Sequence, residues 1–290
     1  MRGDGARGVR GMNVNAWVDG HQPPPLPSRG APAAGVRAPG IWAALGLVGL
    51  YFLLQLVLGV AGGFVVGLAE ALRHAGEPAA RIREQAVAIM QGSDAITLMV
   101  VVTVPLAALV TLYVAHRCWP RLWTLSRPPG FGMCRPAAPA FYVVAVVLGL
   151  LLPPLGGLLT QWLAHGHPVT QNVEQMGHGA TPGLRVALAL MVVSIGPLVE
   201  ELLFRGALLS ALLRRLPAGW AVAACVLLFG AVHLPGLHFQ WYALPDLMLL
   251  ALALCWLRLQ SGSLWPAVLA HGVNNTVAMV ALFVAVAQHG

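Results

Sequence analysis

The chain has 290 residues, of which 58% are hydrophobic and only 9% are charged. An average soluble domain holds about 45–50% apolar and about 25% charged residues, so a water-soluble fold is excluded because it could not cover this much apolar surface. All 17 basic residues are arginines, and the formal net charge is +7. The arginines lie between apolar segments rather than along one polar face, which indicates the loop charges of a membrane protein and no nucleic-acid partner.

The N-terminal segment differs in composition from the remainder of the chain. Residues 1–40 are rich in Gly, Pro, Ala and Arg without periodicity, so we expect a disordered cytoplasmic tail. The charged region, short apolar stretch and cleavage site of a signal peptide are not found there. The first apolar run begins near Ile41 and is long enough to cross a bilayer, and we expect it to be a helix of the mature protein.

Long apolar runs recur after this tail. Most approach the ~17–25 residues that cross a bilayer as a helix, and no strand alternation or internal repeat accompanies them. They lie at about 41–68, 95–115, 140–164, 184–204, 218–235, 244–259 and 264–287. The sequence therefore predicts an all-α fold, a polytopic transmembrane helix bundle of about seven spans. We divide it into N-terminal transmembrane helices (residues 41–165) and a second group (residues 184–288) that carries the polar motifs.

The arginines also predict the orientation of the bundle. Counted through seven spans, thirteen arginines fall on the side of the N-terminus and four on the other side. The thirteen are Arg2, Arg7, Arg10, Arg29, Arg37, Arg117, Arg121, Arg127, Arg135, Arg205, Arg214, Arg215 and Arg258, and the four are Arg73, Arg81, Arg83 and Arg185. Because cytoplasmic loops are enriched in basic residues, we expect a cytoplasmic N-terminus and a C-terminus on the outer side.

Two adjacent glutamates stand out in the fourth span. A charge inside a span costs roughly 2.5–3.5 kcal/mol, so such a residue is a candidate functional residue by default. Glu201 and Arg205 are four residues apart and share one helix face, whereas Glu200 points about 100° away. One carboxylate is therefore paired and the other is free to titrate. The simpler alternative is an isolated ion pair at a helix end.

Two later spans carry histidines, His233 in one and His271 in the other, and Asn275 follows four residues after His271 on the same face. A single histidine on an apolar helix is usually a core residue, but the spacing here favours a cluster. Pro217 marks a turn, and Glu200 lies 17 residues before it while His233 lies 16 residues after it. Since a helix rises ~1.5 Å per residue, the two side chains reach matching heights on an antiparallel pair.

These motifs resemble those of the CAAX-protease and bacteriocin-processing (Abi-type) family of intramembrane glutamic endopeptidases. The family motifs EExxxR, FxxxH and HxxxN are matched in order, each on an apolar helix, over roughly residues 184–280. The matching residues are Glu200, Glu201, Arg205, Phe229, His233, His271 and Asn275. The resemblance implies that residues 184–288 are catalytic intramembrane protease helices. It further implies an integral protein of the bacterial inner membrane.

The resemblance also implies a role for each matched residue. Glu200 would activate a water as general base, and His233 would hold that water or pass its proton to the leaving amine. His271 and Asn275 would polarise the scissile carbonyl and stabilise the oxyanion. The supporting residues would be Glu201, Arg205 and Phe229. No cofactor is implied, and the expected partners are the lipid bilayer and a peptide or membrane-protein substrate.

Two alternatives remain open at the level of sequence. Two glutamates and two histidines could hold zinc in a membrane metalloprotease, although HExxH, GxSG and GxGD motifs of other intramembrane proteases are not found. The second alternative is a non-catalytic membrane scaffold or immunity protein that uses the polar cluster for helix packing. Interhelical polar contacts stabilise membrane proteins by only ~0.6–2 kcal/mol, which is a weak reason to bury so many titratable groups.

Overall fold

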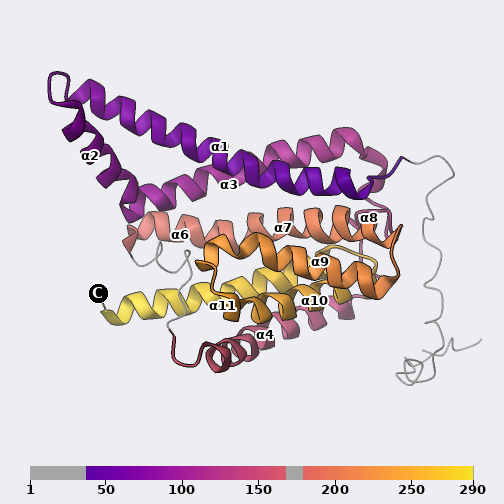
Figure 1. The fold of residues 1–290 in the computed structure, drawn as a ribbon. Coiled ribbons are helices and arrows are strands. Elements are labelled where there is room, and N and C mark those ends of the chain that lie inside the picture. The colour runs from indigo at the N-terminus through magenta and orange to yellow at the C-terminus, as the bar shows by residue number, and fades with distance from the viewer. Residues whose placement is uncertain (1–36, 168–178, 290) are drawn as a thin grey trace, which may run out of the picture.

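The computed structural model describes residues 37–167 and 179–289. Residues 1–36, which form most of the predicted N-terminal tail, lie outside the described residues. In the described part, helices account for nearly all of the regular structure and there is no β-strand. The long helices run alternately up and down the bundle, so that α1 begins at one end and α11 ends at the other (Figure 1).

The helices follow one another with short connections. In chain order the α-helices are α1 (Ile41–Arg73), α2 (Ala79–Gln91), α3 (Ser93–Cys118), α4 (Ala140–Ala164), α6 (Pro182–Leu190), α7 (Gly196–Glu201), α8 (Leu209–Leu213), α9 (Ala218–His233), α10 (Leu244–Ser261) and α11 (Trp265–His289). Two π-helical segments, η3 (Met191–Ile195) and η4 (Leu202–Leu208), join α6, α7 and α8 into one continuous rod. Short 3₁₀ turns lie at η2 (Pro120–Leu122), η5 (Pro235–Leu237) and η6 (Trp241–Ala243).

The predicted all-α transmembrane bundle is confirmed. Six helical segments are long and apolar enough to cross a membrane, and α9 is equally apolar but has only 16 residues. Together they make about seven spans of an integral membrane protein. Side chains such as Phe64 on α1 and Leu158 on α4 are well exposed, as expected where the solvent is lipid.

Two boundaries differ from the prediction. The fourth span ends at Leu213 and not near residue 204, because the helix continues through η4 and α8 with its side chains buried. The first span continues to Arg73, and α2 follows it as a helix that the apolar pattern does not reveal. Polar residues such as Arg81, Arg83 and Glu84 interrupt its apolar positions, so α2 contains no apolar run long enough to span a membrane. Figure 1 shows α1 and α2 projecting beyond the remainder of the bundle.

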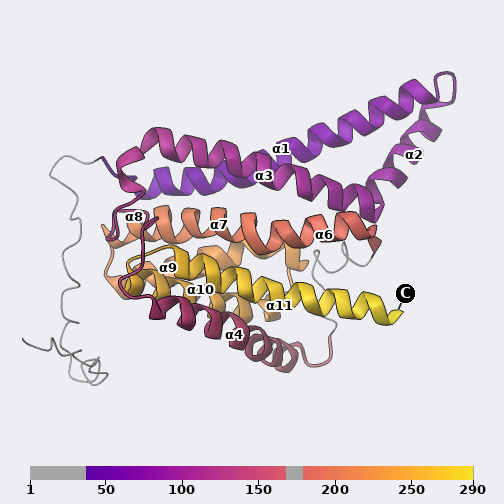
Figure 2. The same ribbon diagram turned by 180° about the vertical axis from the view of Figure 1, so that it is seen from behind.

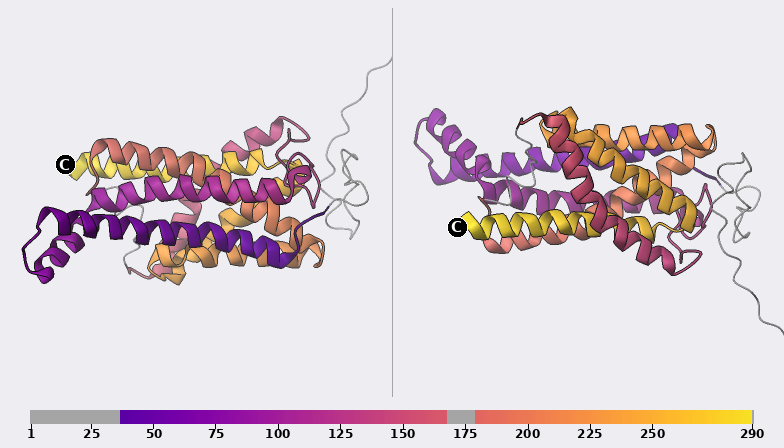
Figure 3. Two further views of the ribbon diagram at one scale, coloured as in Figure 1. Left: turned by 90° about the horizontal axis from the view of Figure 1, so that it is seen from above. Right: turned by 90° about the horizontal axis from the view of Figure 1, so that it is seen from below.

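Small residues allow close helix packing where the polar motifs lie. α4 packs against both α10 and α11 and lies obliquely across them (Figures 2 and 3). A Cβ on Gly149 of α4 would lie 2.7 Å from the carbonyl oxygen of Ala270 on α11, so only glycine permits this approach. Small residues serve the same purpose in membrane proteins generally. The result is a tight α4–α10–α11 layer that fixes the position of α11.

The connection between α3 and α4 closes the bundle at the end where α1 begins (Figure 2). Arg258 of α10 is 1% exposed, and its guanidinium donates to the carbonyl oxygens of Ser126 at 2.8 Å and Gly130 at 2.7 Å. Ser210 also donates to the Gly130 carbonyl, at 3.2 Å. Gly132 has φ +81°, a conformation that favours glycine, and its Cα lies against the Arg258 guanidinium. Through the Gly130 carbonyl, these bonds connect α8 and α10 at this end of the bundle.

Candidate active site

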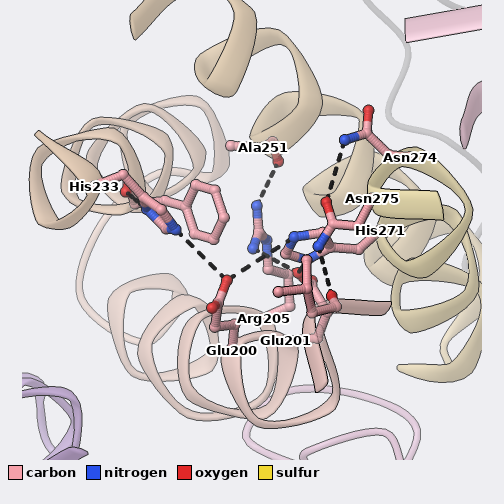
Figure 4. Close-up of polar contacts among 10 residues, drawn as sticks. Glu200, Glu201, Arg205, His233, Ala251, His271, Asn274 and Asn275 are labelled. Carbon is pink, nitrogen blue, oxygen red and sulfur yellow. Dashed lines mark hydrogen bonds and ion pairs between the residues drawn. The ribbon is translucent and has the colours of Figure 1, made fainter. Parts of the chain in front are cut away.

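Three of the predicted residues meet inside the bundle from three different helices (Figure 4). Oε2 of Glu200, on α7, lies 3.7 Å from Nε2 of His233 on α9 and 3.9 Å from Nε2 of His271 on α11. Both separations exceed the ~2.7–3.2 Å of a hydrogen bond. The Glu200 side chain is 19% exposed and that of His233 is 28% exposed. One carboxylate oxygen and two imidazole nitrogens therefore face a shared, partly open position.

Glu201 points the other way and is fully enclosed. Its Oε1 accepts from Nη1 of Arg205 at 2.9 Å and from Nδ1 of His271 at 2.9 Å, and both Glu201 and Arg205 are 0% exposed. The predicted i,i+4 ion pair is thus present. The bond to His271 was not predicted, and it joins the ion pair to the Glu200 position. Glu201 is therefore both the counter-ion of Arg205 and the anchor of one imidazole.

Arg205 has further partners that compensate its burial. Its Nη2 donates to the carbonyl oxygen of Ala251 on α10 at 3.1 Å, and its guanidinium carbon lies 4.4 Å from the ring centre of Phe229. Phe229 also packs edge-on against Phe204, with ring centres 5.1 Å apart. A cation over an aromatic face is stabilised electrostatically. The phenylalanine of the second motif thus has a physical role, because it covers the arginine of the first.

The orientation of both imidazoles follows from their second nitrogens. Nδ1 of His233 lies 2.7 Å from the carbonyl oxygen of Phe229, and Nδ1 of His271 lies 2.9 Å from the Glu201 carboxylate. Carbonyl and ionised carboxylate oxygens only accept hydrogen bonds, so Nδ1 is the donor in each ring. In a neutral ring Nε2 then carries the lone pair. In both rings, the nitrogen that faces Glu200 is therefore the one that can take up a proton.

Asn275 lies beside this group but makes its closest bond elsewhere. Its Nδ2 donates to the carbonyl oxygen of Val192 at 2.8 Å, and its Oδ1 accepts from Asn274 at 3.4 Å. An amide nitrogen carries two hydrogens, so one N–H remains after the bond to Val192. The structure thus brings Asn275 next to His271 and fixes its amide plane against η3.

An irregular helix shapes the surface on which these groups lie. A π-helical turn holds an extra residue and rotates the side chains that follow it, and such turns lie on both sides of α7. Pro197 has no N–H and cannot bond the carbonyl of Val193 four residues earlier. That carbonyl lies against α11, where a Cβ on Gly272 would stand 2.7 Å from it. The glycine lets α11 approach closely enough for His271 to reach Glu201.

Glutamate and histidine are also metal ligands. Within residues 37–167 and 179–289, no three His, Cys, Asp or Glu side chains are arranged to hold an ion together.

Comparison with known proteins identifies the helical region that carries the site. The family model described as type II CAAX prenyl endopeptidase Rce1-like matches residues 182–277. The match begins at α6, extends into α11 and includes all seven motif residues, whereas α1 to α4 lie outside it. No curated protein and no solved structure matches the chain. The match confirms the resemblance to the CAAX-protease and Abi family and supports a membrane protease.

Proposed function

We propose that this chain, whose residues 182–277 match the type II CAAX prenyl endopeptidase Rce1-like family model, is an intramembrane endopeptidase that hydrolyses a peptide bond with a water activated by Glu200. One observation carries the proposal: Glu200 Oε2 faces two Nε2 atoms at 3.7 and 3.9 Å without bonding to either. A water molecule placed between these three atoms can form a hydrogen bond with each of them, because hydrogen bonds to water span about 2.7–3.2 Å.

In the proposed reaction the water gives one proton to the Glu200 carboxylate while its oxygen attacks the scissile carbonyl carbon. The tetrahedral intermediate then breaks at the C–N bond, and the proton passes to the leaving amine. His233 carries this transfer, since its Nδ1–H is held by the Phe229 carbonyl and its Nε2 is free to take up and release a proton. The products are a carboxylate and an amine, and Glu200 is regenerated.

The negative charge that develops on the carbonyl oxygen needs donors. His271 and Asn275 lie on the same face of α11, and Asn275 keeps one amide N–H after bonding to Val192. Nε2 of His271 becomes a donor when the ring is an imidazolium.

The substrate class follows from the location of the site. Glu200, His233 and His271 lie between helices that cross the membrane, so the substrate is a peptide segment that lies in the bilayer or next to it. We propose a membrane protein or membrane-bound peptide as substrate and the bacterial inner membrane as location. The cytoplasmic placement of the N-terminus rests on the arginine asymmetry.

The test is cleavage of a membrane-peptide library by the purified full chain in lipid nanodiscs, with products read by mass spectrometry. Glu200→Gln should lower kcat by roughly 10²–10⁴, the usual effect of a lost general base, without changing the unfolding midpoint. Glu84→Gln is the matched control, because that glutamate is exposed on α2, away from the site. Full proteolysis by well-folded Glu200→Gln would overturn the mechanism. Failure of the unmodified chain to cleave any peptide would favour the scaffold alternative.

A further inference from the structure

The two ends of the bundle differ in how their charges are balanced. At the end where α1 begins, the connections between helices are residues 37–40, 119–139, 214–217 and 262–264. These connections hold six arginines and no aspartate or glutamate. At the opposite end, Arg73 lies 2.9 Å from the Glu70 carboxylate and Arg81 lies 3.7 Å from the Glu77 carboxylate. One end therefore carries positive charge that no neighbouring acidic side chain offsets.

The longest of these connections, between α3 and α4, is folded into a compact cap (Figure 2). Its side chains Leu122 and Phe131 are 0% exposed. The backbone N–H of Met133 donates to the carbonyl oxygen of Trp123 at 2.8 Å and brings two parts of the cap together. The bonds from Arg258 described above hold the cap against α10. The arginines of the cap are thus carried by an ordered backbone and not by a loose loop.

Three arginines of the cap have no acceptor for their guanidinium groups among the described residues, and we call them the arginine platform. Arg121 and Arg135 are exposed, and each lies two residues from the bond between Trp123 and Met133. Arg127 is partly exposed, and its Nη2 is enclosed without a hydrogen-bond partner. A guanidinium only donates hydrogen bonds. The platform can therefore bind a group that presents several acceptor oxygens.

Aromatic side chains place the cap at the surface of the membrane. Trp119 and Trp123 pack edge-on against Phe131, with ring centres 6.5 and 6.2 Å apart. Tryptophan is enriched where the hydrocarbon of a bilayer meets the headgroups. The cap begins directly after Cys118, the last residue of a helix long and apolar enough to cross the membrane. The platform therefore lies near the depth of the lipid phosphates.

We propose that the arginine platform binds the phosphate of an anionic phospholipid in the leaflet at this end of the bundle. A guanidinium donates two parallel N–H bonds to phosphate oxygens. Because the connections at this end have no acidic side chain, the ammonium of a zwitterionic headgroup would be repelled, which favours a lipid with net negative charge. The arginine asymmetry assigns this end to the cytoplasmic leaflet, where anionic lipids are enriched. This inference is independent of the proposed function.

The experiment is native mass spectrometry of the purified full chain in a neutral detergent, which counts bound lipids and yields a Kd for each. The probes are phosphatidylglycerol and phosphatidylcholine with the same acyl chains. We expect phosphatidylglycerol to bind more tightly. Arg121→Gln combined with Arg135→Gln should weaken its binding about thirtyfold, because each basic residue near an anionic surface contributes roughly fivefold. Arg81→Gln combined with Arg83→Gln is the matched control, since it removes the same charge from exposed positions on α2.

Thermal unfolding supplies a second readout. Phosphatidylglycerol should raise the unfolding midpoint of the unmodified chain and of the control, but not that of the platform variant. If the double variant does not fold, Arg121→Gln alone should weaken binding about fivefold. Equal binding of the two lipids, or an equal loss in the control, would overturn the inference. Inorganic phosphate in excess should not displace the lipid, and displacement would identify a site for free phosphate instead.

Discussion

Glu201→Gln tests the part of the site that most distinguishes the structure from the motif alone. The substitution keeps the size of the side chain and removes the charge that Arg205 and His271 share, each at 2.9 Å. Leaving one member of a buried ion pair alone costs about 3–5 kcal/mol. Arg205 keeps the Ala251 carbonyl and the Phe229 ring, so we expect the lower end, about 3 kcal/mol.

The assay is thermal unfolding in detergent, together with the cleavage rate per folded molecule. For a chain of this length, about 3 kcal/mol corresponds to a fall in Tm of roughly 6–12 °C. From the sequence alone, the activity of Glu201→Gln is expected to fall only in proportion to the amount of folded protein that is lost. The structure predicts an additional fall in kcat, because His271 loses the ionised acceptor that orients its ring.

Glu201→Gln combined with Arg205→Met separates the two effects. Removing both charges should restore much of the lost stability, since no unpaired guanidinium remains, whereas kcat should stay low because His271 is still not anchored. Stability of Glu201→Gln equal to that of the unmodified chain would refute the ion-pair argument. Normal kcat in the double variant would refute the anchoring of His271 by Glu201.

Three further predictions concern topology, metal and packing. Reporter fusions after Leu216 and at Gly290 should read cytoplasmic and outer, respectively, and an outer signal after Leu216 would reverse the orientation. Glutamate-based hydrolysis should continue in strong chelator with less than about one metal per chain, whereas stoichiometric zinc with chelator-sensitive turnover would identify a metalloprotease. Gly156→Ala should destabilise the bundle by about 1–3 kcal/mol in an unfolding titration, because the new methyl meets the Asp246 carboxylate, while Gly157→Ala, which meets no atom within 4 Å, should not.

The parts of the site that sequence could predict are those governed by constant helix geometry. The Glu201–Arg205 pair follows from a separation of four residues, and the meeting of Glu200 with His233 follows from nearly equal distances to Pro217. Both are present in the structure. The roles of the residues in catalysis remain a proposal.

Contacts that depend on irregular backbone were not predictable. The Glu201–His271 bond joins residues 70 positions apart, and its formation depends on the π-helical turns around α7 and on the close approach of Gly272 to η3. The same applies to the bond from Asn275 to the Val192 carbonyl. No spacing rule in the sequence marks a π turn. The rotation of α7 relative to α11 therefore could not be predicted from the sequence.

The shortness of α9 has a consequence for the supply of water. At 16 residues and ~1.5 Å per residue, this helix is about 24 Å long, against about 30 Å for the hydrocarbon core. His233 is its last residue, and two 3₁₀ turns follow. Such hydrophobic mismatch thins the adjacent lipid layer at modest cost. A local depression of the membrane beside His233 would admit the hydrolytic water from the aqueous phase, so turnover should depend on the acyl-chain length of the surrounding lipids.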